Sequence, residues 1–244
     1  MTRGEVCREL MLSVPWLAAS LAFAAHQWHP AALACSFMFF LTGLRQVHGS
    51  FHYALGLPRR ATEYVMFVLS ILMLGSMHAV QCTHLLHHRL CLRDGDVEAD
   101  SARMPAWRAI VTGPLFPIRL HAHALQLANS RQRRWILGEL AANVVVIALA
   151  IGMVDQAWLR YHVLAMIAGH CLSPFFAVWT VHHDCEHDGV FARTIRGVVS
   201  SRLTYDMFYH VEHHLFPAVP TCRLDVLARR LDAVAPDLTQ KRVF

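Results

Sequence analysis

Long apolar segments alternate with polar ones along this chain of 244 residues. Between Leu10 and Leu44 no formally charged residue occurs, and the run is interrupted only by the segment 26–30. A helix needs about 20 apolar residues to cross a membrane. The pattern therefore predicts two crossing helices, at roughly residues 10–25 and 31–47, joined by a tight turn.

Three later segments are also strongly apolar. Residues 135–154 and 157–181 predict two more crossing helices, which meet near Asp155. Residues 61–80 are equally apolar apart from Glu63, and hydropathy alone would make them a fifth crossing. The histidine pattern, taken up below, leads us to reject that fifth crossing.

Two amphipathic segments complete the pattern. Residues 107–127 mix apolar side chains with arginines and histidines, so we expect them to lie along the membrane surface. Near the C-terminus, Leu224, Leu227 and Leu231 recur at helical spacing among charged residues. This spacing is typical of an ordinary amphipathic helix.

Composition favours a membrane protein over one that binds nucleic acid. Charged residues make up only 16% of the chain and hydrophobic ones 55%, whereas soluble domains carry about 25% charged residues. The formal net charge of +5 comes from scattered arginines, with Lys241 the only lysine. Scattered arginines suit anionic lipid headgroups rather than nucleic acid. Seven cysteines without a CxxC pair argue against a secreted disulfide framework.

Histidine is the anomaly of the composition, because 18 occur and most fall in clusters. In chain order these are an HxxxH at 48–52, an HxxHH at 84–88, the sequence HHDCEH at 182–187 and a second HxxHH at 210–214. On a helix, positions i, i+3 and i+4 share one face. An HxxHH can therefore give one metal a pair of imidazoles and a neighbouring metal a third. Chance predicts about 0.1 HxxHH in a chain of this histidine content, so two of them indicate a site.

The number of histidines indicates how many metals the site holds. Imidazole suits iron, copper, zinc and nickel, so the ligand type does not choose among them. Ten nitrogen donors exceed what one tetrahedral zinc site uses. Two metals with about five ligands each fit the count.

Clusters that build one site must lie on one side of the membrane, so an even number of crossings must separate them. Only 31 residues lie between His52 and His84, too few for two crossings of about 20 residues and a turn. We therefore predict that residues 61–80 form a buried or interfacial helix and do not cross. Two crossings separate His88 from His183, and none separates His187 from His210.

The arginines give the orientation. The polar segments on the side of the clusters carry many arginines, whereas the two turns on the far side carry none apart from Arg160 at the edge of a crossing. By the positive-inside rule the clusters and both termini face the cytoplasm. The expected fold is one all-α integral membrane domain over residues 1–244, with four transmembrane helices, interfacial helices and a cytosolic histidine-rich cap.

The clusters resemble those of the membrane fatty acid desaturase and hydroxylase superfamily. The sequence HVEHHLFP, which begins at His210, is similar to the last histidine box of that family, including the trailing Leu-Phe-Pro. The pair His183 and His187 is similar to an additional box that the family places before it. The resemblance covers about residues 10–231 and is specific to the superfamily, but it does not identify the substrate.

The resemblance implies a di-iron centre whose ligands come from the boxes. At the third cluster the choice between His182 and His183 stays open, with His183 taken as the ligand and His182 as its competitor. The implied metal ligands are His48, His52, His84, His87, His88, His183, His187, His210, His213 and His214.

Polar residues near the boxes have two possible roles. Carboxylates often accept a hydrogen bond from the second nitrogen of a ligating imidazole, but those beside the boxes are equally compatible with solvated charge. His170, inside a predicted crossing, is expected to be a structural histidine with its hydrogen bonds satisfied. The carboxylates are Asp184, Glu186, Asp188, Asp206 and Glu212.

The function that the resemblance implies is an oxidoreductase that uses O2 to desaturate an aliphatic, fatty-acyl-like chain. It implies two Fe ions, O2 as co-substrate, a membrane lipid or other apolar or acyl substrate, and an external electron donor. That donor would be of the ferredoxin or cytochrome b5 type, with its reductase. We expect the chain to be a multi-pass protein of the bacterial inner membrane.

Alternatives remain open at this point. One is a hydroxylase or other C–H-oxidising tailoring enzyme that acts on a small amphiphilic metabolite. A metal transporter is the alternative outside enzymes, but it would place its ligands near the bilayer midplane on broken helices. A membrane haem carrier would need histidine pairs inside facing crossings, whereas the boxes here flank the crossings.

Overall fold

The computed structural model describes residues 1–153 and 155–237, which form helices and loops. The first half of the chain comprises α1 (Arg3–Met11), α2 (Val14–Ala25), α3 (His29–Phe51), α4 (Arg59–Met73), α5 (Met77–Leu90), the short η1 (Ala99–Arg103), α6 (Ala106–Val111) and α7 (Leu115–Leu127). The second half comprises α8 (Ser130–Ala148), η2 (Leu149–Met153), α9 (Ala157–Ser173), η3 (Pro174–Trp179), α10 (Thr180–His182), α11 (Val198–Leu203), α12 (His210–Leu215), η4 (Thr221–Arg223) and α13 (Leu224–Val234).

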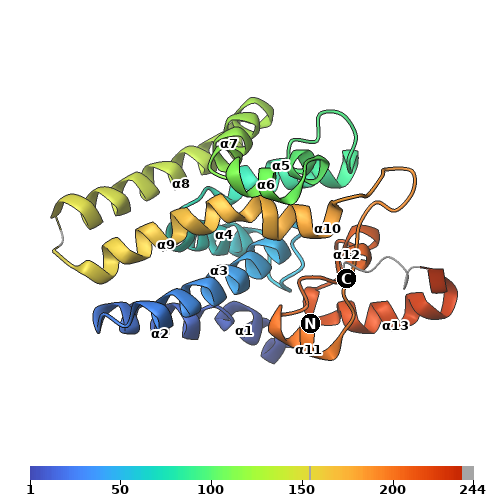
Figure 1. The fold of residues 1–244 in the computed structure, drawn as a ribbon, viewed down its shortest axis with the longest axis horizontal. Coiled ribbons are helices and arrows are strands. Elements are labelled where there is room, and N and C mark those ends of the chain that lie inside the picture. Colours follow the sequence, from blue (N-terminus) through green and yellow to red (C-terminus); the bar gives the residue numbers. More distant parts are fainter. Residues whose placement is uncertain (154, 238–244) are drawn as a thin grey trace.

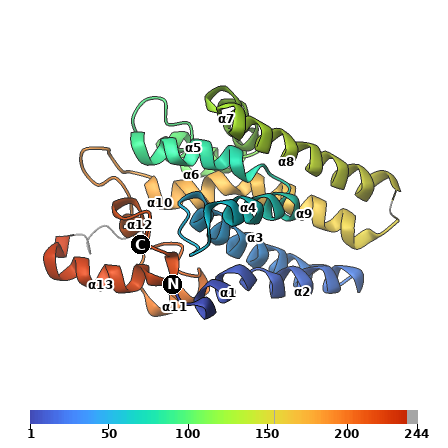
Figure 2. The same cartoon turned by 180° about the vertical axis from the view of Figure 1, so that it is seen from behind.

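Among the described residues, four helical segments are long and apolar enough to cross a membrane, which confirms the four predicted crossings. They are Arg3–Ala25, His29–Phe51, Ser130–Met153 and Ala157–His182. The first begins earlier than predicted, because α1 and α2 are nearly continuous. Figures 1 and 2 show the four segments side by side, with the turn between α2 and α3 and the turn between α8 and α9 at the same end of the molecule.

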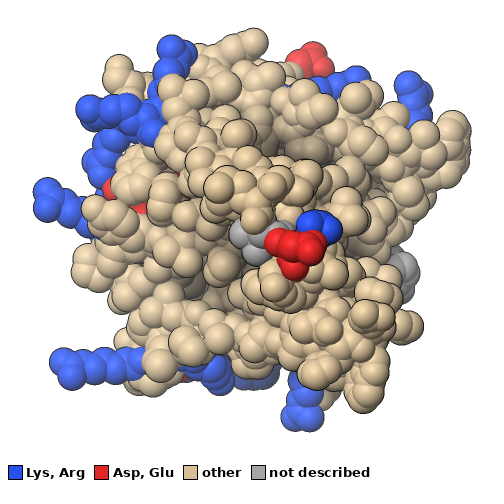
Figure 3. Space-filling view, turned by 90° about the vertical axis from the view of Figure 1, so that its left-hand side faces the viewer, with Lys and Arg blue, Asp and Glu red and all other residues tan. Residues whose placement is uncertain are grey.

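That far end carries little charge. Figure 3 views it and shows mainly uncharged atoms, with arginines at the margins and one acidic and one basic group near the centre. Arg160 donates to Asp155 at 2.9 Å and to the carbonyl of Ala150 at 3.3 Å. The arginine at the edge of this crossing is therefore partly neutralised and satisfies a carbonyl near the end of α8.

The core lies between α3, α4 and α9, which approach one another closely where glycines face large side chains. A Cβ atom on Gly43 would lie 2.7 Å from Met73 Sδ, and one on Gly169 would lie 2.6 Å from the ring of Phe40. Met73 belongs to the main buried cluster together with Phe39 and Met66 of α3 and α4. Because glycine has no side chain, Gly43 and Gly169 allow α3 to pack closely against both α4 and α9.

The predicted helix at 61–80 is broken. α4 and α5 have 15 and 14 residues and meet at an angle of 112°. Leu74 ends α4 in the left-handed conformation with φ of 58°, and Ser76 caps α5 by accepting from the amide of Ala79. The segment therefore turns sharply instead of running straight, and the turn directs α5 toward the end of the molecule where α10 and α12 lie (Figure 1).

Polar side chains from three other helices satisfy the backbone groups that the break frees. His162 and His170 of α9 donate from Nε2 to the carbonyls of Leu72 and Met73, at 2.8 and 2.7 Å. The amide of Ser76 donates to Nε2 of His121 on α7 at 3.0 Å. Unpaired backbone groups are costly away from water, so these histidines stabilise the break. The expectation that His170 is structural agrees with this contact.

Two residues of α8 complete the support. Glu139 is fully buried and accepts from the hydroxyl of Ser76 (2.6 Å), the amide of His78 (3.1 Å) and Nδ1 of His78 (2.6 Å). Asn143, with its amide oriented to satisfy both neighbours, donates to the carbonyl of Ser70 and accepts from the amide of Gly75. Glu139 thus stabilises the first turn of α5, where a negative charge also interacts favourably with the helix dipole.

A buried arginine joins the N-terminal helix to the C-terminal part. Arg45 of α3 forms two hydrogen bonds with Glu9 of α1, at 2.6 and 3.0 Å. It also donates to the carbonyl of Tyr205 and lies 3.4 Å from Asp206. Tyr205 and Asp206 both have positive φ, 52° and 58°. Because Arg45 lies one turn before His48, it links the helix of the first box to the turn that precedes the last box.

Candidate metal centre

Four helices bring nine imidazoles together. The end of α3 contributes the first box, α5 the second, α10 a single histidine and α12 the last box. The rings form two groups, and within each group one ligand atom per residue lies within 4.8 Å of all the others. The first group is His48, His52, His84, His88 and His213; the second is His87, His182, His210 and His214.

Helical spacing explains how each HxxHH serves both groups. On α5, the i, i+4 pair His84 and His88 joins the first group, while His87 joins the second. On α12 the arrangement is reversed, since the pair His210 and His214 joins the second group and His213 the first. This division is the one that the spacing predicts, a pair for one metal and a third ligand for its neighbour.

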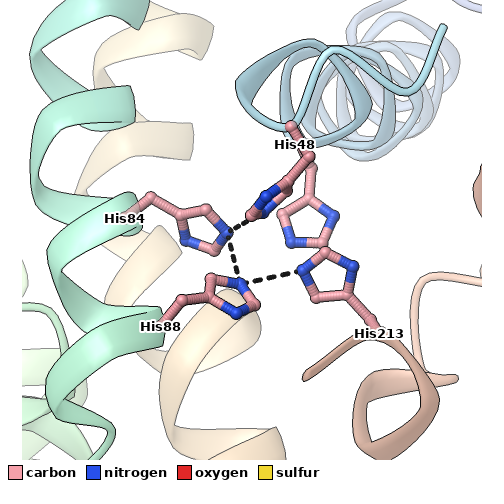
Figure 4. Close-up of side chains that lie close together, drawn as sticks. His48, His84, His88 and His213 are labelled. Carbon is pink, nitrogen blue, oxygen red and sulfur yellow. Dashed lines mark hydrogen bonds between the residues drawn. The ribbon is translucent and has the colours of Figure 1, made fainter. Parts of the chain in front are cut away.

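In the first group the Nε2 atoms face one another. His84 Nε2 lies 3.1 Å from Nε2 of His52 and 3.1 Å from Nε2 of His88, and His213 Nε2 lies 2.9 Å from that of His88. The rings of His48 and His213 are 4.0 Å apart. Figure 4 shows His48, His84, His88 and His213, from three helices, turned toward a common centre.

The second group has the same geometry around His182. Its Nε2 lies 3.1 Å from Nε2 of His87 and 2.9 Å from Nε2 of His210, which is 3.1 Å from that of His214. The two groups adjoin, because the rings of His88 and His214 stack at 4.3 Å. The arrangement offers two neighbouring positions for metal ions.

Contacts on the outer ring nitrogens fix which nitrogen faces inward. Nδ1 of His182 donates to the carbonyl of Phe191 at 2.9 Å, and Nδ1 of His87 lies 2.8 Å from a carboxylate oxygen of Asp96. Nδ1 of His84 lies 2.8 Å from Glu98 in the same way. A neutral ring that donates from Nδ1 carries a lone pair on Nε2. Nε2 atoms that all carry lone pairs cannot donate hydrogen bonds to one another, but at separations of about 3 Å they can bind the same cation.

Burial keeps most of these rings neutral. It lowers the pKa of His84, His210, His213 and His214 well below the usual value, and neighbouring histidines lower it further. The same causes lower the pKa of His88 to about 2. Neutral imidazole is the form that binds metal, so at neutral pH a metal ion need not displace protons from these rings.

His87 is the exception. Burial acts to lower its pKa, but the hydrogen bond to Asp96 and the charges of Glu98 and Asp96 outweigh burial and raise it. Burial acts to raise the pKa of Asp96, but the hydrogen bond from His87, the charge of His87 and the hydrogen bonds from the amides of Leu92 and Ala99 outweigh burial and lower that pKa. Positive charge at His87 is therefore favoured, and a metal cation on its Nε2 gains from the same carboxylate.

Two of the ten predicted ligands lie outside both groups. His183 stacks on Trp179, with ring centroids 3.9 Å apart, and its Nδ1 donates to the carbonyl of Trp179. His187 donates from Nδ1 to the carbonyl of Cys91 and lies 3.6 Å from Asp188. At the third cluster the structure brings His182 into the second group, so our ligand set below takes His182 in place of His183 and omits His187.

The carboxylates that contact the ligands are not those that the sequence analysis named. Asp96 and Glu98 follow the second box in the loop after α5. In the sequence, the acidic run that begins at Asp94, shortly after that box, could have indicated them as partners of the ligands. Of the residues named beforehand, Glu212 accepts from Arg196 and Thr194, and Asp206 pairs with Arg45. Asp184, Glu186 and Asp188 are on the loop after α10, where Asp184 lies 3.7 Å from Arg193.

A hollow of about 700 Å³ lies beside the second group. Its lining includes Trp179, His182, His183, Arg103 and Met104. His182 is the member of the second group that borders the hollow, and it is only 2% exposed. It is polar as well as apolar in its lining, as suits the polar end of an amphiphile or water.

Asp96 offers a direct test of how the outer contacts act. We expect Asp96→Asn to weaken metal binding about 10–100-fold, because the amide no longer attracts positive charge at His87. Competition with a chelator, followed by metal analysis, measures this. Asp188→Asn is the matched control, since that carboxylate is 90% exposed beside His187. Equal metal retention in both variants would contradict the role assigned to Asp96.

Comparison with known proteins bears on this centre. The family model described as "Fatty acid desaturase" matches residues 26–243. The curated protein sphingolipid delta(4)-desaturase/C4-monooxygenase DES2 of Bos taurus is 24% identical over 241 residues, which cover 91% of this chain and 69% of the relative. No solved structure matches the chain significantly.

Proposed function

Because this chain belongs to the fatty acid desaturase family and is an oxidoreductase, we propose that it is an O2-dependent di-iron desaturase of an aliphatic, fatty-acyl-like chain. The observation that carries the proposal is the pair of adjoining groups of imidazoles. Family membership favours iron, since imidazole alone suits several metals. It also removes the metal-transporter alternative.

The ligand assignment follows the two groups. One iron is held by His48, His52, His84, His88 and His213, and the other by His87, His182, His210 and His214. When bound, such an iron pair supplies the oxidising power, from O2 and two electrons, to break an unactivated C–H bond. Everything else is contributed by the protein.

The protein's own residues prepare the centre. Burial keeps the box imidazoles neutral and ready to bind metal. Asp96 and the carbonyl of Phe191 orient His87 and His182, so that Nε2 points inward. The ligand rings are mostly buried, which limits the access of bulk water. Exclusion of water protects a reactive centre from side reactions.

The substrate class follows from the surroundings. Four apolar helices support a location of the centre at a membrane, and we propose a membrane lipid or other acyl substrate. The curated relative is named as both a desaturase and a monooxygenase, so hydroxylation is the second candidate. The two outcomes differ in which hydrogen is nearest the oxidant. A small amphiphilic metabolite is the alternative substrate.

The remaining assignments concern partners and location. Two electrons must come from outside, and we propose a ferredoxin or a cytochrome b5 with its reductase. Figure 3 shows that the far end of the crossings is mainly uncharged, and most arginines of the sequence lie in the polar segments around the boxes. By the positive-inside rule we propose that the metal centre faces the cytoplasm of a bacterial cell.

The function is tested with the iron-loaded protein in nanodiscs made from a total lipid extract, supplied with ferredoxin, its reductase and O2. We expect a lipid product that lacks two hydrogens, or one that gains an oxygen atom, and no product without O2. Mass spectrometry distinguishes the two. His88→Ala serves as the inactive control. Conversion that is absent across acyl lipids and amphiphilic metabolites, with iron fully bound, would overturn the proposal.

A further inference from the structure

The short helix α11 is apolar on its outward side. Val198, Val199 and Leu203 are 71%, 72% and 64% exposed, whereas Ser201 is buried against the protein. A helix on a water-exposed surface has the opposite arrangement, with polar residues outside. Single exposed apolar side chains occur on the surface of any protein, but three large ones together on one short helix form a patch that needs an explanation.

The position of α11 relates this apolar side to the membrane. Trp16, near the start of α2, donates from its indole nitrogen to the hydroxyl of Tyr205, two residues after α11, at 2.9 Å. Trp and Tyr are enriched at the level of the lipid headgroups. Met11 and Val14, at the junction of α1 and α2, are exposed apolar residues of the first crossing segment. The residue that follows α11 closely is therefore bound to the first crossing segment, which also exposes apolar side chains near that contact.

Basic residues accompany the apolar ones. Arg202 lies between Ser201 and Leu203 and is exposed. Arg3 and Arg8 of α1 are exposed too, and Figures 1 and 2 both place the N-terminus beside α11. Apolar side chains with arginines at their edge are typical of helices that lie in the headgroup region, where the arginines reach the phosphates.

We propose that α11 lies in the headgroup region of the same membrane that the four long helices cross, with Val198, Val199 and Leu203 in contact with lipid. The occupant of this surface is the bilayer. Two contacts make it adjoin the crossing helices: the bond of Trp16 to Tyr205, and the bond of Arg45 to the carbonyl of Tyr205. The proposal is independent of which metal the protein binds.

The consequence concerns the last histidine box. α11 is joined to α12 by a few residues, and these include the two with positive φ that Arg45 holds. Lipid contact on one side and Arg45 on the other would fix this connection. The membrane thereby helps to position His210, His213 and His214, which belong to both groups of imidazoles.

The test uses the full chain in nanodiscs of phosphatidylethanolamine and phosphatidylglycerol, with one chain per disc. A photoreactive benzophenone residue is introduced at position 199, 203 or 234, in separate variants. Val234 is the matched control, because it is 79% exposed and apolar, but it ends α13, far from the crossing helices in Figures 1 and 2. Metal content equal to that of the unmodified chain shows that each variant is folded.

After illumination, we expect lipid adducts at 199 and 203 on the order of tenfold above those at 234, as identified by mass spectrometry of the peptides. Equal, low lipid labelling at all three positions would overturn the proposal. So would cross-links from 199 or 203 to a second copy of the chain, in samples with more than one chain per disc, if they replaced the lipid adducts. Either result would leave the metal centre and the proposed reaction unaffected.

Discussion

Replacing His182 by alanine is expected to remove the metal of the second group and to reduce activity by more than about a hundredfold. Loss of a residue that only supports a ligand costs about 10–100-fold, and loss of a ligand itself should cost more. Replacing the adjacent His183 is expected to leave metal content near that of the wild type. The contrast between two neighbouring histidines is the sharpest consequence of the geometry.

The physical reason lies in where each ring points. His182 Nε2 lies within 3.1 Å of Nε2 of both His87 and His210. The ring of His183 instead stacks on Trp179 at 3.9 Å, and its Nδ1 donates to that residue's carbonyl. Loss of His182 leaves three imidazoles in the second group, whereas loss of His183 leaves both groups complete.

Iron per chain, measured on His182→Ala and His183→Ala purified side by side in mild detergent, decides between the two assignments. His187→Ala, which removes another histidine outside both groups, is the matched control and should retain its iron. Loss of iron from His183→Ala with retention in His182→Ala would restore the ligand that the box spacing favours. Equal loss from both would mean that the cluster acts as a unit.

The second large effect is expected from Glu139. Glu139→Ala should lower the stability of the folded protein by about 3–5 kcal/mol, as happens when one partner of a buried pair is removed. The substitution leaves Ser76 and His78 without their acceptor, and both are buried at the start of α5. Because α5 carries His84, His87 and His88, iron binding should weaken together with stability.

Glu139→Gln separates shape from acceptor number. Glutamine keeps the side-chain length but offers one acceptor oxygen where Glu139 uses two, so its stability should lie between those of wild type and Glu139→Ala. Thermal unfolding in detergent measures the series. Arg229→Ala is the control: it removes the partner of Asp225, and the two side chains are 69% and 40% exposed, so the pair contributes about 0–1 kcal/mol. A Glu139→Ala variant as stable as Arg229→Ala would show that the break needs no support.

Box spacing predicted much of the centre, since i, i+3 and i+4 positions share a helix face. His84, His87 and His88 of α5 all belong to the groups, and they divide between the groups as expected. The third cluster was different because helix α10 ends at His182. His183 follows with ψ of 144° in extended backbone. The HxxxH at 183–187 therefore does not lie on one helical face, and its spacing does not predict that the two rings face the same metal.

The crossings were predictable because length and hydropathy determine them, whereas the break between α4 and α5 was not. Counting crossings between His52 and His84 indicated that the segment does not cross. It did not reveal a 112° bend, which depends on Glu139, Asn143 and histidines of α7 and α9. Contacts of this kind join residues far apart in sequence, and a hydropathy profile contains no information about them.

The measurement that tests the central claim most directly is Mössbauer spectroscopy on protein produced with isotopically enriched iron, combined with metal analysis. The account predicts about two irons per chain, present as a coupled pair that is lost in His88→Ala and in His210→Ala, one ligand from each group. A single zinc ion, or no stoichiometric metal from iron-replete cells, would contradict the proposal that these histidines hold a di-iron centre.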